Sequence, residues 1–159
     1  MEELLRNLLT YSAWANAVFF HAWGKSPARD HEEMRTRVGH IVGVQKAFLS
    51  ILRGDQPQIP ADGPSATIEE LKAGAEISHA GLLDALALYD SVSLTRLIKI
   101  PWIYDPPLIP VYEALIQVVL HTQHHRGQCM TRLRDFGGQP KTVDWISWLL
   151  RVKPAARWE

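Results

Sequence analysis

Apolar residues recur at spacings of three and four along most of this 159-residue chain. This period places them on one face of an α-helix, so each such run predicts an amphipathic helix with one buried side. Four of the runs are long. The predicted helices cover residues 3–23, about 31–53, 67–88 and 111–136.

Capping and turn residues mark the ends of these helices. Asp30 is the candidate N-cap of the second helix, which ends at Gly54-Asp55. Thr67, followed by Glu70, gives the signature of a capping box at the start of the third helix. Residues 55–66 contain three prolines, two aspartates and a glycine and predict a surface loop.

Residues 91–110 break the helical pattern with β-branched residues and then four prolines. Proline excludes helix from much of this segment, so we expect an extended crossover, or a short hairpin, between the third and fourth helices. A short last helix, capped by Thr142, is expected around Trp145 and Trp148. The pattern predicts an all-α four-helix bundle with a long crossover before the fourth long helix, as a single domain over residues 1–159.

Composition narrows the classes of function. The 47% hydrophobic and 21% charged residues are typical of a globular domain. The 17 basic and 17 acidic residues balance, so nucleic-acid binding gains no support. No apolar run approaches the roughly 18 residues of a membrane helix, and the first residues lack the regions of a signal peptide. We expect a cytoplasmic protein without membrane or nucleic-acid partners, and the single cysteine, Cys129, agrees with this location.

Three of the seven histidines lie within five consecutive positions: His121, His124 and His125. His121 and His125 are one helical turn apart and can reach the same ion. With about 100° of rotation per residue, His125 falls within the apolar stripe of the fourth helix and His121 at its edge, whereas His124 points away. His40 lies at the edge of the stripe of the second helix. We therefore predict a site made of His40, His121 and His125.

Three imidazoles suit a divalent ion of Zn, Ni, Cu or Fe. Because three protein ligands leave coordination positions open, such a site is typical of catalysis rather than of structure. The expected chemistry is Lewis-acid activation, in which the ion lowers the pKa of a bound water or thiol to give a nucleophile near neutral pH. A run of surface histidines is the alternative interpretation.

Other polar residues near these positions have structural and functional interpretations. His79, on the stripe of the third helix, and Cys129 are alternative fourth ligands, although a hydrogen-bonded core histidine and a small buried thiol are simpler explanations. No residue stands out as a general base. The candidate catalytic residues are Gln128 and Asn16. Gln128 could orient a metal ligand or a bound water, and Asn16 could contact a bound ligand.

Two further residues of the fourth helix predict packing contacts. Arg126 is expected to pair with a carboxylate, or to contact a substrate anion if the pocket opens to it. Gly127 costs roughly 1 kcal/mol against alanine inside a helix, so it predicts the close approach of another helix. The apolar residues on the outer side of this helix exceed what one core needs and predict either further bundle contacts or a dimer face: Tyr112, Ile116, Val119, Leu120 and Met130.

Two sequence blocks, His40–Leu49 followed by Gly54 and His121–Gln128, resemble the signatures of the DinB/YfiT-like bundle proteins. Tyr11–Asn16 is similar to the first-helix pattern of that family, and Val143–Trp145 to its C-terminal end. The resemblance covers nearly the whole chain. It implies a four-helix bundle, often a homodimer, with a divalent metal bound by three histidines.

By motif, the ligands that the resemblance implies are His40, His121 and His125. The family includes transferases and isomerases that use a low-molecular-weight thiol, while many members have no known reaction. We therefore expect a metal-dependent enzyme, with Zn or Ni, that transfers a small thiol to a small-molecule substrate or hydrolyses one. The alternatives are a non-catalytic, stress-associated protein with a closed metal or ligand site, and a structural bundle without metal.

Overall fold

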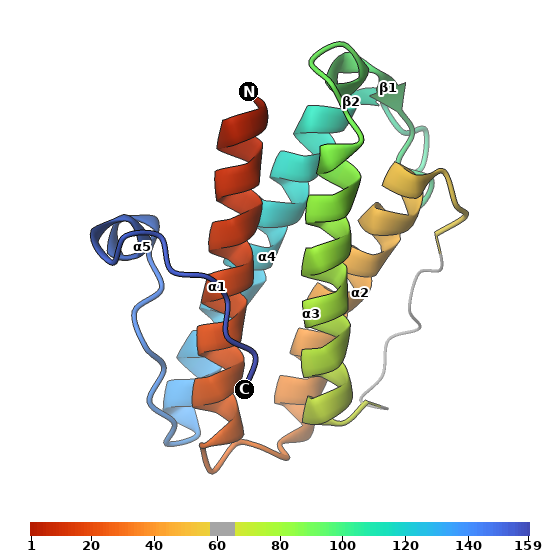
Figure 1. Cartoon of the computed structure of the whole chain (residues 1–159). Helices are drawn as coiled ribbons and strands as arrows, with labels where there is room; N and C mark the ends of the chain where they lie inside the picture. The colour runs from red at the N-terminus through yellow and green to blue at the C-terminus, as the bar shows by residue number, and fades with distance from the viewer. Residues whose placement is uncertain (58–65) are drawn as a thin grey trace.

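Four long helices form the structure, a computed structural model that describes residues 1–57 and 66–159. They are α1 (Glu2–Gly24), α2 (Glu32–Arg53), α3 (Ile68–Ala87) and α4 (Val111–Asp135). The short helix α5 (Trp145–Leu150) lies on the outside of the bundle, beside α1 (Figure 1). The predicted all-α four-helix bundle with a short C-terminal helix is confirmed.

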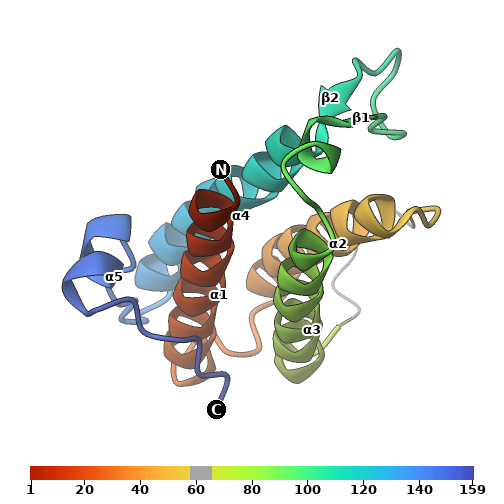
Figure 2. The same ribbon diagram turned by 45° about the horizontal axis from the view of Figure 1, so that its top comes forward.

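The long helices are arranged so that α2 and α4 are neighbours. α1 packs against α3 and α4, and α2 packs against the same two helices. α1 and α4 run in one direction along the bundle, whereas α2 and α3 run in the other (Figures 1 and 2). Because the predicted ligands come from α2 and α4, the fold can bring them together.

The inward faces build two apolar clusters, one toward each end of the bundle. Leu9, Leu82 and Leu115 belong to the cluster near the start of α4, and Trp23 and Leu133 to the other. Both clusters take residues from all four long helices. Between the two clusters, each of the four long helices contributes buried polar residues: Asn16, Gln45, His79, Thr122 and Arg126.

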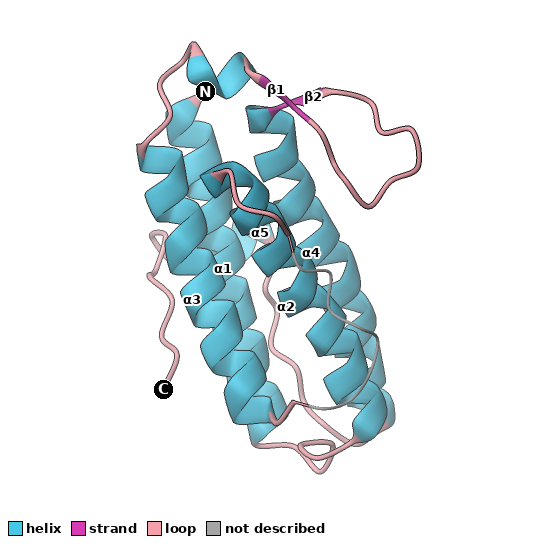
Figure 3. Cartoon of the chain, turned by 90° about the vertical axis from the view of Figure 1, so that its right-hand side faces the viewer, coloured by secondary structure: helices cyan, strands magenta, loops and turns pink. Residues whose placement is uncertain are grey.

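The connection between α3 and α4 is long, as predicted, but it stays at one end of the bundle (Figure 3). It contains the 3-10 turn η1 (Ser93–Thr95) and an antiparallel hairpin of β1 (Leu97–Ile98) and β2 (Ile109–Pro110). The hairpin form of this segment is therefore the one observed. Pro110 ends β2 and directly precedes α4, where a missing N–H does not interrupt a helix.

The start of α2 differs from the prediction. His31, rather than Asp30, occupies the N-cap, and no side chain caps the helix. The backbone N–H of His31 donates to the carbonyl of Ala28, so the turn after α1 continues through Asp30. Asp30 is thus part of that turn and is not available as the cap.

The start of α5 also differs. Asp144, rather than Thr142, is its N-cap residue. The Tyr11 hydroxyl donates to the carbonyl of Val143 at 2.8 Å, and the Val143 side chain is buried against α1. This anchor holds the chain in a non-helical form through Val143, so the helix begins only after it.

The predicted capping box of α3 is present. The backbone N–H of Glu70 donates to the Thr67 hydroxyl at 3.2 Å, and the backbone N–H of Thr67 donates to the Glu70 carboxylate at 2.8 Å. Residues 58–65 of the loop predicted over 55–66 lie outside the described residues. In the described part of the chain, none of the helices is both long and apolar enough to cross a membrane.

The close helix contact predicted at Gly127 is wrong. A Cβ atom added there would meet nothing within 4 Å, because Gly127 is exposed. The close approach occurs instead between α2 and α3. A Cβ atom added at Gly81 would lie 2.6 Å from the side chain of Leu49, and one at Gly74 would lie 3.0 Å from that of Val42.

Candidate metal centre

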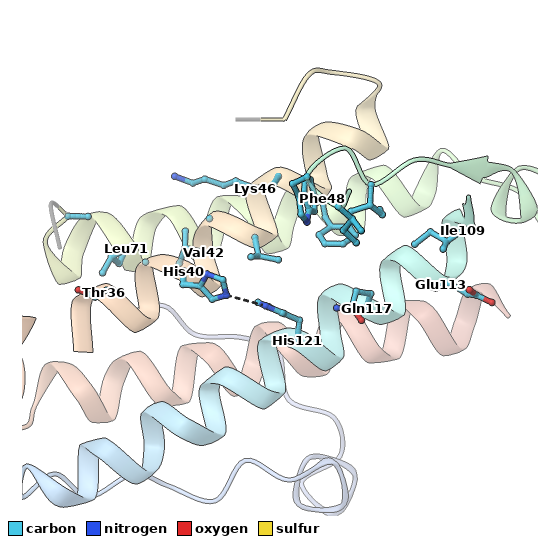
Figure 4. Close-up of a pocket in the computed structure, with 18 of the residues that line it drawn as sticks. Thr36, His40, Val42, Lys46, Phe48, Leu71, Ile109, Glu113, Gln117 and His121 are labelled. Carbon is cyan, nitrogen blue, oxygen red and sulfur yellow. Dashed lines mark hydrogen bonds between the residues drawn. The ribbon is translucent and has the colours of Figure 1, made fainter. Parts of the chain in front are cut away.

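His40 on α2 and His121 and His125 on α4 form one cluster. One ring nitrogen of each residue lies within 4.8 Å of the other two. The Nε2 atoms of His40 and His121 are 3.2 Å apart, and the two rings point toward each other across the gap between the helices (Figure 4). The structure thus brings together the three residues that were predicted from their positions on the helix faces. His124 is exposed, as predicted.

The cluster fits a divalent metal ion. A tetrahedral zinc ion with Zn–N distances of about 2.0–2.1 Å places two ligand nitrogens about 3.3 Å apart. The observed 3.2 Å between His40 and His121 agrees with this spacing. The three donors are imidazoles from two helices, a set that suits Zn, Ni, Cu or Fe.

Two of the rings are held in the neutral form that binds metal. Burial, followed by the neighbouring His125, His40 and His124, lowers the pKa of His121 to about 4. Burial also lowers the pKa of His125, partly offset by its hydrogen bond to Gln128. Because a ligand imidazole must be unprotonated, both residues can bind an ion at neutral pH without first losing a proton.

Gln128 fixes the orientation of His125. Its side-chain oxygen lies 2.9 Å from Nδ1 of His125 and its nitrogen lies 3.0 Å from Nε2 of His124. Since the amide oxygen can only accept, the proton of His125 is on Nδ1 and the lone pair of Nε2 is available to the cluster. His121 differs, because its Nδ1 is buried and none of the described residues hydrogen-bonds to it.

Replacing Gln128 with leucine is expected to weaken metal binding about tenfold to a hundredfold, the usual effect of losing an outer hydrogen bond to a ligand histidine. Titration of metal-free protein with Zn²⁺ against a competing chelator measures this change. Gln123→Leu is the matched control, because Gln123 is exposed on the same helix one residue from His124. Equal affinities of the two variants would show that Gln128 does not orient the ligand.

A cavity of about 820 Å³ opens beside the histidines. This volume is within the range of about 300–1,000 Å³ that is typical of small-molecule sites. Its walls come from α2, α4, the start of α3 and the hairpin, and His40 and His121 are among the lining residues (Figure 4). Sequence periodicity did not reveal this cavity. The residues that line it include Phe48, Ile100, Trp102, Gln117 and His121.

His79 belongs to the bundle core and is not part of the histidine cluster. It is 3% exposed, and its Nε2 lies 2.9 Å from the amide nitrogen of Asn16 and 3.2 Å from that of Gln45. Gln45 also donates to the Thr122 hydroxyl at 3.1 Å. The interpretation of His79 as a hydrogen-bonded core histidine is confirmed. Gln45 and Thr122 escaped the sequence analysis, although both lie at inward positions of their helices.

Among the described residues, Arg126 pairs with an amide and with no carboxylate, contrary to the prediction. Its guanidinium is buried, donates to the side-chain oxygen of Asn16 at 2.9 Å, and lies 5.8 Å from the ring centroid of Tyr11. Asn16 therefore joins Arg126 to His79 inside the bundle, and it is not among the described residues that line the cavity. Its position shows a role in packing and hydrogen bonding within the core.

Cys129 is fully buried in an apolar cluster, as the simpler interpretation predicted. Burial raises the pKa of its thiol to about 12. The thiolate that binds metals is therefore disfavoured at neutral pH. Within the described residues, the group of side chains able to hold an ion comprises the three histidines and does not include Cys129 or His79.

Lowering the pH from about 7 to about 5 is expected to reduce the free energy of unfolding by roughly 2 kcal/mol through His79 alone. Burial, followed by the charge of Arg126, lowers the pKa of His79 to about 3. The unfolded chain binds this proton below about pH 6.5, whereas the folded chain does not. The stabilisation is thus complete above that pH and is lost as the pH falls toward the folded pKa.

Chemical denaturation of the wild type and of His79→Gln at both pH values tests this expectation. Glutamine keeps a neutral hydrogen-bonding side chain at the position and does not titrate. The variant should therefore lose about 2 kcal/mol less than the wild type over the same pH interval. Equal losses would mean that His79 is not held neutral in the folded protein.

A comparison with protein families matches residues 4–151 of the chain to the model described as the DinB family. A search among curated proteins finds no match. The matched region contains all four long helices except the first residues of α1, and it includes the whole histidine cluster. The resemblance seen in the two histidine-containing blocks is thereby confirmed, and the chain belongs to the DinB family.

Proposed function

We propose that this DinB-family protein is a metal-dependent enzyme in which His40, His121 and His125 hold a divalent ion, Zn or Ni. Its reaction is the transfer of a small thiol to an electrophilic substrate, or the hydrolysis of a small substrate. The observation that carries the proposal is the position of the histidine cluster at the wall of the 820 Å³ cavity. A site that only stores a metal has no need of such a space.

Neither of the two alternative fourth ligands is available to an ion at the cluster, which supports an open site. His79 is hydrogen-bonded within the core, and Cys129 is buried among apolar side chains. With three imidazole ligands, a bound ion would supply Lewis-acid activation of a water molecule or a thiol. The residues of the chain hold the ligands in place: Gln128 orients His125, and the helices α2 and α4 fix the spacing between His40 and His121.

The thiol transfer balances without any further reagent. The thiol sulfur forms a bond to an electrophilic carbon, the leaving group departs with its bonding electron pair, and the thiol proton passes to solvent. In the hydrolytic reaction, water adds across the bond that is cleaved.

A homodimer stays a prediction, for which the exposed Leu120 on α4 is the supporting observation.

The test compares metal-loaded, metal-free and His125→Ala protein in two reactions. One is the conjugation of cysteine or glutathione with 1-chloro-2,4-dinitrobenzene, followed by absorbance, and the other is the hydrolysis of p-nitrophenyl acetate. We expect turnover in at least one reaction that requires the metal and is lost in His125→Ala. If metal-loaded protein is no faster than the metal-free form in either, a binding role without turnover replaces the proposal.

A further inference from the structure

The cavity beside the histidines has a polar end at the ligands and a mostly apolar end at the hairpin. α4 supplies the polar residues Gln117 and His121, which lie one helical turn apart (Figure 4). α2 supplies Phe48, and the segment between β1 and β2 supplies Trp102. The rings of Phe48 and Trp102 pack edge to face with centroids 5.2 Å apart. Gln117 thus adjoins the ligands, the aromatic pair lies toward the hairpin, and the charged residues Lys46 and Glu113 complete the lining.

Gln117 is suited to contact a bound molecule. It is exposed to the cavity, and no described residue hydrogen-bonds to its amide. Four residues of helix, at about 1.5 Å each, place it about 6 Å along the axis from His121. Since an amide both donates and accepts, it can bind a hydroxyl, a carbonyl or a carboxylate that neighbours the group at the histidines.

The aromatic wall is suited to an apolar group. Phe48 and Ile100 are 4% and 3% exposed, so their side chains are fixed by the core, and Trp102 covers them from the hairpin. An apolar group that packs against the half-buried ring of Trp102 and the edge of Phe48 loses its contact with water on that side. Burial of a group the size of a phenyl ring is expected to tighten binding about tenfold to a hundredfold.

We propose that the cavity selects a substrate of two parts: a polar head that sits at the histidine cluster and bonds to Gln117, and an aromatic or similarly bulky apolar body that packs against Phe48 and Trp102. This inference rests on the proposed function, because the polar head is the part that reacts at the metal. We expect small, fully polar molecules to be poor substrates, because they bury no apolar surface against Phe48 and Trp102. Gln117 and Trp102 are the residues that determine specificity.

Two hydroxamic acids separate this inference from the proposed function. Acetohydroxamic acid carries the metal-binding head alone, and 3-phenylpropanohydroxamic acid carries the same head with an apolar body. Calorimetric titration of the zinc-loaded protein with each compound gives the two dissociation constants. We expect both compounds to bind, and the phenyl compound to bind about tenfold to a hundredfold more tightly.

Variants assign the two parts of the cavity. Trp102→Ala should reduce the ratio of the two affinities toward one, whereas Gln117→Leu should weaken both compounds about threefold to tenfold. Tyr104→Ala is the control on the same hairpin, because Tyr104 is 99% exposed and is not among the described residues that line the cavity. It should leave the ratio unchanged. Trp102 is on the hairpin, where it packs against one apolar cluster, so circular dichroism of Trp102→Ala beside the wild type checks that the bundle stays folded.

The outcomes are distinct. Equal affinities of the two compounds would overturn the two-part substrate and leave the metal site intact. Binding of the phenyl compound to metal-free protein as tightly as to zinc-loaded protein would overturn both the placement of the head and the open metal site of the proposed function. Failure of both compounds to bind zinc-loaded protein would overturn both proposals, and a ratio unaffected by Trp102→Ala would overturn the aromatic wall.

Discussion

Replacing His125 with alanine is expected to remove stoichiometric metal binding, with a loss of affinity of at least about a hundredfold. The physical reason is the small number of ligands. Four-ligand zinc sites bind with about 10–16 kcal/mol, which gives roughly 3 kcal/mol for each ligand, and 2.7 kcal/mol already corresponds to about a hundredfold. With His125 gone, the two remaining ligands, His40 and His121, come from different helices. α4 then no longer offers two ligand nitrogens one turn apart.

Elemental mass spectrometry on tag-free protein after incubation with Zn or Ni measures this effect. The wild type should retain close to one equivalent, and His125→Ala should retain almost none after buffer exchange. His21→Ala is the matched control, because His21 is exposed on α1 and is not part of the cluster. A wild type that binds no metal, or a His125→Ala variant that binds as well as the control, would contradict the three-histidine site.

The helical period is what made the site predictable. It assigns each position of a helix to a face, so it could place His125 on an inward-facing stripe, His40 and His121 at the edges of such stripes, and His124 outside. In the structure, ring nitrogens from His40, His121 and His125 lie within 4.8 Å of one another, with His40 exposed at the edge of the α2 stripe and His124 exposed outside the cluster. The same period predicted the four long helices, whose observed bounds differ from the expected ones by only a few residues.

The errors have a different physical origin. The period gives the face of a residue but not the residue that lies opposite on another helix. Arg126 was correctly expected to need a partner, yet the partner is the amide of Asn16, which is 110 residues away in sequence. The close helix contact falls at Gly81 rather than at Gly127 for the same reason, since only the packing of α2 on α3 decides it.

The cavity was also beyond the reach of the sequence pattern. Its aromatic wall depends on Trp102, which lies in a segment that the prolines mark only as non-helical. The hairpin register pairs Ile98 with Ile109, and it is this pairing that returns the segment to the end of α2 and α4. Short strands of two residues carry too little periodicity to reveal such a pairing in advance.

Replacing Asn16 with leucine is expected to reduce the free energy of unfolding by about 3–5 kcal/mol, the cost of leaving a buried charge without its partner. Asn16 is 3% exposed and accepts from the Arg126 guanidinium through its side-chain oxygen. Its amide nitrogen also donates to His79. The polar layer lies between the two apolar clusters, so water cannot readily replace either hydrogen bond.

A double-mutant cycle gives the sharper test, with chemical denaturation followed by circular dichroism. Asn16→Leu combined with Arg126→Met removes the buried charge together with its partner, so the double variant should be more stable than Asn16→Leu alone. His79 keeps its contact with Gln45 in both variants. If the two single losses simply add, Asn16 does not serve as the partner of the buried guanidinium, and the layer is held together by packing. If the double variant recovers stability, the charge of Arg126 is what makes Asn16 indispensable, which explains why a polar residue occupies this inward position of α1.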